Sequence, residues 1–500
     1  MVGTQPVNRK KAFNMLFFLE FWERFGFYGL QAVLAGFFVK SLGMEDAESF
    51  VVFGAFSAMV YGYVSIGGFL GDKVLGTQRT ITLGAAVLMI GYFMMGMAGT
   101  NKDMVFLALG AIACGNGIFK ANPSSLLSKL YEGAEEELDS AFTMYYMAVN
   151  IGSFVSMLLV PIIGAQYGLD LGFMICAMGL VLAIGGFVSF RHLVRGIDSP
   201  AGAEKLSMPK LLATIAGVVA MTFISSWLLS HLSVAHWLLL IIGILVYGVF
   251  IKMIFQSSGA TRSHMIAAMI LIVEAIVFFT LYNQMPTSLN FFAIKNVEHS
   301  IMGINIPDAQ VFQTLNPFWI MLASPVLAFL YSRFGSQGKD LSMPAKFALG
   351  MLLTAGSFLV VGFSANFASE AGIVSAWWLV GSYFLSSIGE LLISGLGLSM
   401  ISKLVPQKLI GFLMGAWFLT TAISSIIGGW VASLTAVPKD VTDPVLTLGV
   451  YSDVFTQIGM VTLGVTLVMA LTVPLLNRLI NKQDDAEAEV EAEAEAVLEK

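Results

Sequence analysis

Apolar stretches of about 20 residues recur along the whole chain between short polar connections, and this pattern restricts the chain to one class of fold. The hydrocarbon core of a bilayer is about 30 Å thick and takes roughly 20 apolar residues per helical crossing. Inside lipid, a helix satisfies its backbone N–H and C=O groups within the segment itself. Of the 500 residues, 57% are hydrophobic and only 12% are charged, against roughly 25% charged in soluble domains. We therefore predict an all-α membrane protein and exclude a water-soluble globule.

The lengths of the apolar runs predict fourteen transmembrane helices. We expect six at 13–40, 50–72, 80–98, 104–128, 139–165 and 171–191, and six more at 265–293, 313–332, 346–364, 374–403, 409–436 and 450–475. Two extra stretches, 210–230 and 235–255, lie between these groups. The predicted domains are an N-terminal six-helix bundle (1–192), a linker with two extra helices (193–264), a C-terminal six-helix bundle (265–480) and an acidic cytoplasmic tail (481–500).

The distribution of Lys and Arg supports this register. Of the 26 basic residues, 20 fall on one predicted face, Arg24 and Lys120 fall inside helices, and the opposite face has only Lys40, Lys102, Lys295 and Lys439. Positive charge collects in cytoplasmic loops, so both termini are expected in the cytoplasm. We predict an integral membrane protein. Residues 483–500 carry eight acids and one lysine without an apolar face, which indicates a solvated end.

Two six-helix groups joined by an insert suggest the parallel repeats of the major facilitator fold. The connection after the second helix, Gly68-x-x-x-Asp72-Lys73-x-x-Gly76-x-x-Arg79, resembles the loop signature of that superfamily with one residue of extra spacing. The same residues also suit a plain helix stop with positive charge on the inside. The motif alone leaves both interpretations open.

Six ionisable residues lie inside predicted helices, where a charge costs about 3 kcal/mol or more unless it is paired or hydrated. They are Glu20, Glu23, Arg24, Lys120, Glu274 and Glu390. At a rise of about 1.5 Å per residue, all six lie roughly 10 to 20 Å deep, as does Asn150. A shared level near mid-membrane is where a substrate site between two rocking bundles is expected. Glu274 is the least firmly placed, because a shifted helix boundary would make it interfacial.

The first helix has a polar stripe that must face the protein interior. Its members recur at intervals of three and four residues: Glu20, Glu23, Arg24, Phe27, Tyr28 and Gln31. One interpretation is a static salt bridge that fixes helix packing. The other is proton coupling: the four intramembrane acids exceed the two bases by two charges, which favours protonation of at least one carboxylate.

Lys120 lies on a helix that is suited to close packing. It follows Gly115 and Gly117 and precedes Asn122-Pro123, and small residues let helix backbones approach each other. A buried ammonium there needs an anion, and the candidates are Glu20, Glu23, Glu390 or a substrate carboxylate.

Further polar groups occur on later helices. Tyr146 and Asn150 are four residues apart and form a polar face, which suits either ligand binding or hydrogen bonding between helices. Glu390 has Ser394 one turn onward and needs a cationic partner. Trp417 suits packing or a pocket wall.

The positions of the histidines and the lack of a P-loop argue against other classes of membrane protein. All five histidines fall at helix ends or in connections, which argues against an intramembrane metal site and against histidine-based catalysis. No phosphate-binding P-loop occurs, which argues against an ATP-driven pump. We therefore expect a protein that is not an enzyme, has no cofactor and no nucleic-acid partner, and draws its energy from a gradient.

Several motifs together resemble one family across essentially the whole chain. Glu20-Phe21-Trp22-Glu23-Arg24-Phe25-Gly26-Phe27-Tyr28 resembles E-x-x-E-R-F-x-Y-Y and departs from it at Phe27. Other matches are Gly115 to Asn122, Tyr145 to Ser153, Gln284-Met285, Asn316-Pro317, Pro344-x-Lys346-Phe347, Gly389-Glu390-Leu391 and Gly411-x-x-Met414-Gly415-x-Trp417-Phe418. The chain is similar to the proton-dependent oligopeptide transporters of the major facilitator superfamily, in the bacterial di- and tripeptide permease group.

The resemblance implies a symporter of the bacterial inner membrane that imports dipeptides and tripeptides with protons and uses the proton gradient as its energy source. It implies proton-coupling roles for Glu20, Glu23, Arg24, Lys120 and Glu390. It assigns the peptide amino terminus to Glu390 and Asn316, and the carboxylate to Lys120 with Tyr28 and Asn150. The implied substrate site also includes Tyr61, Tyr146, Ser394 and Trp417. Gln31 stands where family members often carry a basic residue, so this position and Phe27 depart from the pattern.

Alternative functions remain open at the level of sequence. The same fold could move nitrate, a peptidomimetic or an amine, also by export. A membrane receptor or scaffold would not need a buried excess of charge, and a membrane hydrolase is disfavoured by the histidine positions. We expect a monomer surrounded by membrane lipid.

Overall fold

The computed structural model describes residues 8–337, 339–405 and 409–482. The predicted acidic tail therefore lies outside the described residues from position 483 onward. Twelve helices of the described part are long and apolar enough to cross a membrane. Two more, α1 and α15, are 32 and 28 residues long and carry four of the six predicted intramembrane charges. The all-α membrane class is confirmed, and α1 and α15 together with the twelve are consistent with the expected fourteen crossings, a count that stays a prediction.

The first half of the chain forms α1 (Arg9–Lys40), α2 (Asp46–Gly62), α3 (Val64–Phe69), the π-helical turn η1 (Leu70–Val74), α4 (Thr77–Ala98), α5 (Lys102–Leu130), α6 (Glu135–Tyr167) and α7 (Leu169–Phe190). The linker contains η2 (Arg191–Val194), α8 (Pro200–Ala203), α9 (Met208–Ser230) and α10 (Leu232–Gln256).

The second half begins with α11 (Gly259–Tyr282), α12 (Ser288–Asn296), β1 (Ser300–Ile301), β2 (Ile304–Asn305) and η3 (Ala309–Thr314). It continues with α13 (Leu315–Gly335), α14 (Met343–Ser364), η4 (Ala365–Phe367), α15 (Trp377–Leu404), α16 (Ile410–Ser433) and α17 (Pro444–Ile480). Strands β1 and β2 pair as a small antiparallel hairpin, with Met302 and Gly303 at positive φ in its turn.

Two predicted helices differ from the observed elements. The segment 50–72 crosses the membrane as one span, but it is divided into α2, α3 and η1. Four glycines between 62 and 71 lower its helix propensity. The segment 265–293 does not form one helix, because α11 ends at Tyr282 and α12 begins at Ser288. Pro286 lies between them, lacks an N–H group and disfavours a helical conformation in the residue before it.

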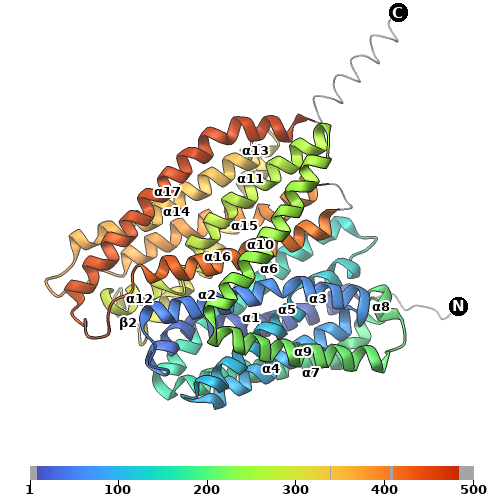
Figure 1. Ribbon diagram of the computed structural model, residues 1–500, viewed down its shortest axis with the longest axis horizontal. Coiled ribbons are helices and arrows are strands. Elements are labelled where there is room, and N and C mark those ends of the chain that lie inside the picture. Colours follow the sequence, from blue (N-terminus) through green and yellow to red (C-terminus); the bar gives the residue numbers. More distant parts are fainter. Residues whose placement is uncertain (1–7, 338, 406–408, 483–500) are drawn as a thin grey trace, which may run out of the picture.

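The helices of the two halves form two groups (Figure 1). Helices α1, α4, α5 and α7 lie in one group, and α11, α13, α14, α15 and α17 lie in the other. Within the first group α4 packs on α5 and α1 on α6, and within the second α14 packs on α15 and α17. The two groups meet chiefly where α2 packs on α16. The predicted domain limits at 192, 264 and 480 stay predictions.

The hydrogen bonds and ion pairs between the halves lie at one end of the molecule, as far as the described residues go. The Lys295 Nζ lies 2.5 Å from the Asp46 carboxylate, and the Lys439 Nζ lies 3.3 Å from that of Glu45. Gln313 Nε2 donates to the Ala32 carbonyl at 2.8 Å. This end contains the C-terminal part of α1 and the N-terminal part of α17. The start of α1 and the end of α17 therefore lie at the opposite end.

The two extra helices attach to different halves. Ser225 of α9 shares a 2.9 Å hydrogen bond with the Tyr63 hydroxyl, and Gly110 of α5 packs on the α9 backbone. Tyr247 of α10 shares a 2.7 Å hydrogen bond with Thr420 of α16. Figure 1 shows α9 beside the first group and α10 beside the second. The helix pair α9 and α10 is thus bonded to both halves.

Candidate substrate and proton site

The polar stripe on α1 forms a compact ion cluster. Arg24 lies 3.3 Å from the Glu20 carboxylate and 2.5 Å from that of Glu23. All three side chains are buried, with Glu23 fully so. The predicted inward orientation of the stripe is therefore correct. One guanidinium serves two carboxylates, so the cluster holds one more negative than positive charge when both acids are ionised.

Two residues complete this cluster that the sequence did not single out. Asn116 Nδ2 of α5 donates to Glu23 Oε1 at 2.9 Å, and the Tyr145 hydroxyl of α6 donates to Glu20 Oε2. The sequence feature that could have marked Tyr145 is the helix face that it shares with two small residues. Ala148 follows it after three residues, and Gly152 follows Ala148 after four. A Cβ atom at Gly152 would lie 2.6 Å from the Phe21 carbonyl oxygen of α1, so this face needs small residues.

Lys120 contacts an aromatic ring instead of a carboxylate. Its Nζ lies 4.1 Å from the centroid of the Tyr61 ring, and it has no ion pair among the described residues. The charges of Glu20, Glu23 and Arg24 act on it from a distance. The predicted close approach of its helix is present, since a Cβ atom at Gly117 would lie 2.3 Å from that of Tyr63. Lys120 thus keeps an ammonium available to an incoming anion.

Glu390 of α15 bonds to a neutral amide and has no cationic partner within the described part of the chain. Its Oε2 accepts from Asn316 Nδ2 of α13 at 2.8 Å, and the same amide lies 3.1 Å from Ser387 Oγ. Glu390 and Asn316 are both nearly buried. Ser387 is a further residue that the sequence did not assign to the site. Its signal was the spacing, three residues before Glu390 on the same helix face.

Tyrosines of the first half connect the two charged groups. The charge of Glu390 acts on Tyr28, Tyr61 and Tyr146, which places the carboxylate of the second half near hydroxyls from α1, α2 and α6. Tyr61 also carries Lys120 on its ring. The structure therefore brings Lys120, Tyr28, Tyr61, Tyr146, Asn316 and Glu390 to one region between the halves.

The remaining predicted residues have other surroundings. Asn150 Nδ2 donates to the Tyr146 carbonyl of its own helix at 2.9 Å. Trp417 packs edge to face on Phe279 and presses on Gly397, where a Cβ atom would lie 2.1 Å from its ring. These contacts account for the burial of Trp417. Ser394 is half-buried one turn beyond Glu390. For all three, substrate contact stays a prediction.

Glu274 does not join the site. It is buried in α11, its Oε2 has no hydrogen-bond partner, and it forms no ion pair with any described residue. No group of three or more potential metal ligands occurs within the ranges that the structure describes.

A sequence model described as the POT family matches residues 78–452. The chain belongs to the POT family. Among curated POT-like relatives it is 52% identical over 464 residues to the dipeptide and tripeptide permease B of Aliivibrio fischeri (strain MJ11), covering 93% of this chain and 94% of the relative. It is 53% identical over 459 residues to the dipeptide and tripeptide permease A of Proteus mirabilis (strain HI4320), covering 92% and 93%.

The POT-family chain also resembles solved structures along nearly its full length. The tetrameric PepTSo2 crystal structure has a TM-score of 0.85 at 38% identity and covers 95% of this chain and 100% of its own. A structure described under substrate recognition in proton dependent oligopeptide transporters gives a TM-score of 0.83 at 38% identity. These likenesses confirm the predicted family and fold class.

Proposed function

We propose that this POT-family protein is a symporter that imports dipeptides and tripeptides together with protons. The observation that carries the proposal is a pair of opposite charges without ionic partners among the described residues: Lys120 from the first half and Glu390 from the second. A short peptide is a zwitterion, and its two ends match these two groups. The curated relatives named as dipeptide and tripeptide permeases support the same substrate class.

Nitrate and simple amines fit the site less well. Nitrate would be attracted to Lys120 but would meet the carboxylate of Glu390 without a compensating cation. An amine would leave Lys120, which is half-buried, without an anion, which is costly in a medium of low polarity. A peptide or peptidomimetic satisfies both groups at once. Because peptides share only their ends and backbone, one such site accepts many side chains.

Transport by alternating access is supported by where the halves make contact. For the described residues, the ion pairs and hydrogen bonds between the halves all lie at one end of the molecule. This end is opposite to the start of α1 and the end of α17. We infer that both termini lie in the cytoplasm, so that this end is extracytoplasmic and the halves are joined on that side. The α1 cluster of Glu20, Glu23 and Arg24 then serves proton movement. Each chain contributes both charged groups, so we propose the monomer as the functional unit in the inner membrane.

Uptake into proteoliposomes tests the proposal. Labelled dialanine should accumulate when the interior is alkaline, and a protonophore should stop the accumulation. Unlabelled dipeptides and tripeptides should compete, whereas free amino acids, tetrapeptides and nitrate should not. Competition by nitrate or by simple amines with no effect of dipeptides would reject the peptide assignment. Accumulation that ignores the pH gradient would reject symport.

A further inference from the structure

A second polar cavity lies far from the site between the halves, at the C-terminal end of α7. Its volume is about 550 Å³, and the residues that matter for its chemistry are Gln78, Arg191, His192, Arg195 and Asp198. These residues come from the start of α4 and from the linker after α7. None of them belongs to the proposed site between the halves.

One arginine of this cavity is held in place by a buried amide. Gln78 is 5% exposed, and its Nε2 donates to the carbonyls of Val194 and Ile197 at 2.9 and 2.8 Å. These bonds fix its Oε1, which accepts from Arg191 Nε at 2.8 Å. The two terminal nitrogens of Arg191 have no partner among the described residues. The guanidinium is therefore oriented in advance, with its outer donors free.

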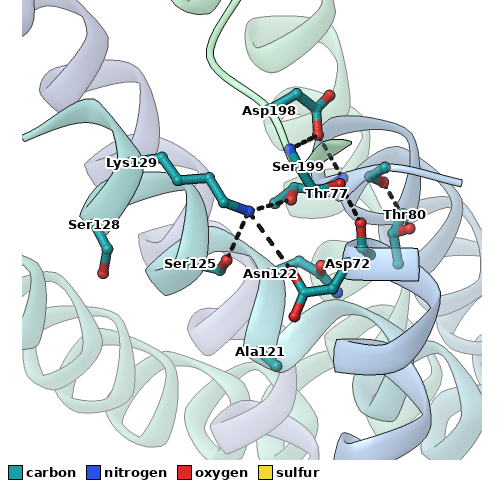
Figure 2. A network of polar contacts seen from close by, with 12 residues as sticks. Asp72, Thr77, Thr80, Ala121, Asn122, Ser125, Ser128, Lys129, Asp198 and Ser199 are labelled. Carbon is teal, nitrogen blue, oxygen red and sulfur yellow. Dashed lines mark hydrogen bonds and ion pairs between the residues drawn. The ribbon is translucent and has the colours of Figure 1, made fainter. Parts of the chain in front are cut away.

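The acid that lines the cavity is already engaged. Asp198 Oδ1 accepts from the backbone N–H groups of Thr77 and Ser199 at 2.6 and 2.7 Å, as Figure 2 shows. It thereby caps the N-terminus of α4, where a negative charge is favoured. It forms no ion pair with Arg191 or Arg195, and the Arg195 side chain has no partner in the described ranges. The cavity thus presents two unmatched guanidinium groups.

The cavity lies at the level where lipid headgroups are expected. The last turn of α7 exposes Val188 and Phe190, each 53% accessible, and the start of α9 exposes Met208 and Leu212. These apolar side chains belong to helices that cross the membrane. The polar cavity begins directly after Phe190, so the lipid-facing surface ends at its mouth.

We propose that this cavity binds the phosphate of an acidic phospholipid from the cytoplasmic leaflet, such as phosphatidylglycerol. Guanidinium groups bind phosphate oxygens in a forked geometry, and basic pockets between membrane helices on this side suit acidic headgroups. A soluble phosphate compound offers the same chemistry, but the adjoining apolar helix surfaces favour a ligand with acyl chains. The headgroup then stabilises the linker on the rest of the first half.

The linker is well placed to transmit this effect. Ser199 Oγ donates to the Gly71 carbonyl at 2.6 Å, next to Asp72, which lies 3.6 Å from Lys129 (Figure 2). Lys129 also donates to Thr77 Oγ1 at 2.9 Å. A lipid at Arg191 and Arg195 would thus support the connection between the second and third spans. The residues that Ser199 and Lys129 contact, Gly71, Asp72 and Thr77, all belong to the loop signature Gly68 to Arg79.

Native mass spectrometry of the purified full-length protein tests the proposal. The probes are phosphatidylglycerol and phosphatidylcholine with identical acyl chains. The test variant is Arg191→Gln/Arg195→Gln. The matched control, Arg478→Gln/Lys252→Gln, removes two exposed basic residues elsewhere on the same predicted face. A third variant, Arg191→Lys/Arg195→Lys, keeps the charge without the fork. Melting temperature and dialanine uptake show that each variant is folded.

We expect the wild type to bind phosphatidylglycerol more tightly than phosphatidylcholine. Each arginine should contribute about fivefold to the affinity, so the glutamine pair should weaken phosphatidylglycerol binding about 25-fold. The control pair should not weaken it. The lysine pair should retain part of the affinity. Equal binding by the wild type and the glutamine pair would overturn the proposal. Displacement of the lipid by millimolar inorganic phosphate, with the same sensitivity to the glutamine pair, would assign the cavity to a soluble phosphate compound instead.

Discussion

The Lys120 ammonium rests on the face of the Tyr61 ring, 4.1 Å from its centroid, in a region where the nearest carboxylates belong to other partners. Glu20 and Glu23 are bound to Arg24, and Glu390 is bound to Asn316. The ring stabilises a half-buried cation without neutralising it. An incoming carboxylate can therefore pair with Lys120 without first displacing an acid of the protein.

Replacement of Tyr61 tests this arrangement. Tyr61→Leu removes the ring and should raise the KM for dialanine about 3- to 30-fold, in line with a desolvated cation–π contact. Tyr61→Phe keeps the ring and should stay within about threefold of the wild type. Uptake at several peptide concentrations gives both values. If the phenylalanine variant lost as much affinity as the leucine variant, the hydroxyl and not the ring would be the important group.

Lys120→Ala should abolish gradient-driven uptake and leave the protein folded. The variant removes the cation that meets the peptide carboxylate, and a charge-assisted hydrogen bond is worth about 10- to 100-fold in affinity. Binding of a dipeptide with an amidated C-terminus should be weak in the wild type and should change little in the variant. Wild-type uptake by Lys120→Ala would show that the site is placed wrongly.

Glu390→Gln should lower dialanine affinity about 10- to 100-fold, because it removes the anion that faces the peptide amino group. For an N-acetylated dipeptide, wild type and variant should differ little. Glu274→Gln is the matched control, since Glu274 is a buried acid of the same half without an ionic partner. It should retain uptake, and a loss as large as that of Glu390→Gln would contradict the separation of the two residues.

Glu23→Gln distinguishes proton coupling from a static salt bridge in α1. If Glu23 takes part in proton movement, the variant should lose accumulation driven by a pH gradient but retain exchange of labelled for unlabelled dialanine. A purely structural role predicts that exchange, accumulation and melting temperature all fall together. Parallel counterflow and uptake assays in the same proteoliposomes separate the two outcomes.

The ion pair of Lys295 and Asp46 should hold the halves together at the end where they meet. Asp46 is nearly buried and the pair distance is 2.5 Å, so Lys295→Gln leaves a poorly hydrated carboxylate. Distances between spin labels at Asp103 and Glu298, both exposed near this end, should shift toward longer values. The charge-reversed double variant, Lys295→Asp/Asp46→Lys, should restore the short distances. Unchanged distributions in Lys295→Gln would remove the pair from the gating mechanism.

The sequence predicted the positions of the membrane helices and the inward orientation of the α1 stripe, because both follow from hydropathy and helical period. It could not decide which of several anions would serve Lys120, because that choice depends on how α1, α2 and α5 pack. In the structure, Lys120 contacts the Tyr61 ring and none of the candidate acids. Asn116 and Tyr145 were missed for a related reason: a neutral polar residue in a membrane helix gives no charge signal that marks it.

Helix ends were harder to predict than helix centres. The run 265–293 is mostly apolar, and Pro286 marks the break between α11, which ends at Tyr282, and α12. Trp417 illustrates a different difficulty. Its motif suggests a substrate contact, whereas its surroundings are Phe279 and the bare backbone of Gly397. Family motifs preserve packing and binding residues alike, and only the three-dimensional neighbours separate them.

The divided attachment of α9 and α10 affects any attempt to shorten this protein to twelve spans. Removing the pair would uncover two surfaces instead of one: the seam around Gly110 and Tyr63, and the seam around Thr420 and Ile423, which packs on Gly243. The Tyr63 hydroxyl would lose its hydrogen bond to Ser225, and the Thr420 hydroxyl would lose its bond to Tyr247 and keep only the Ala416 carbonyl of its own helix. A working minimal transporter would therefore need separate apolar replacements on each half.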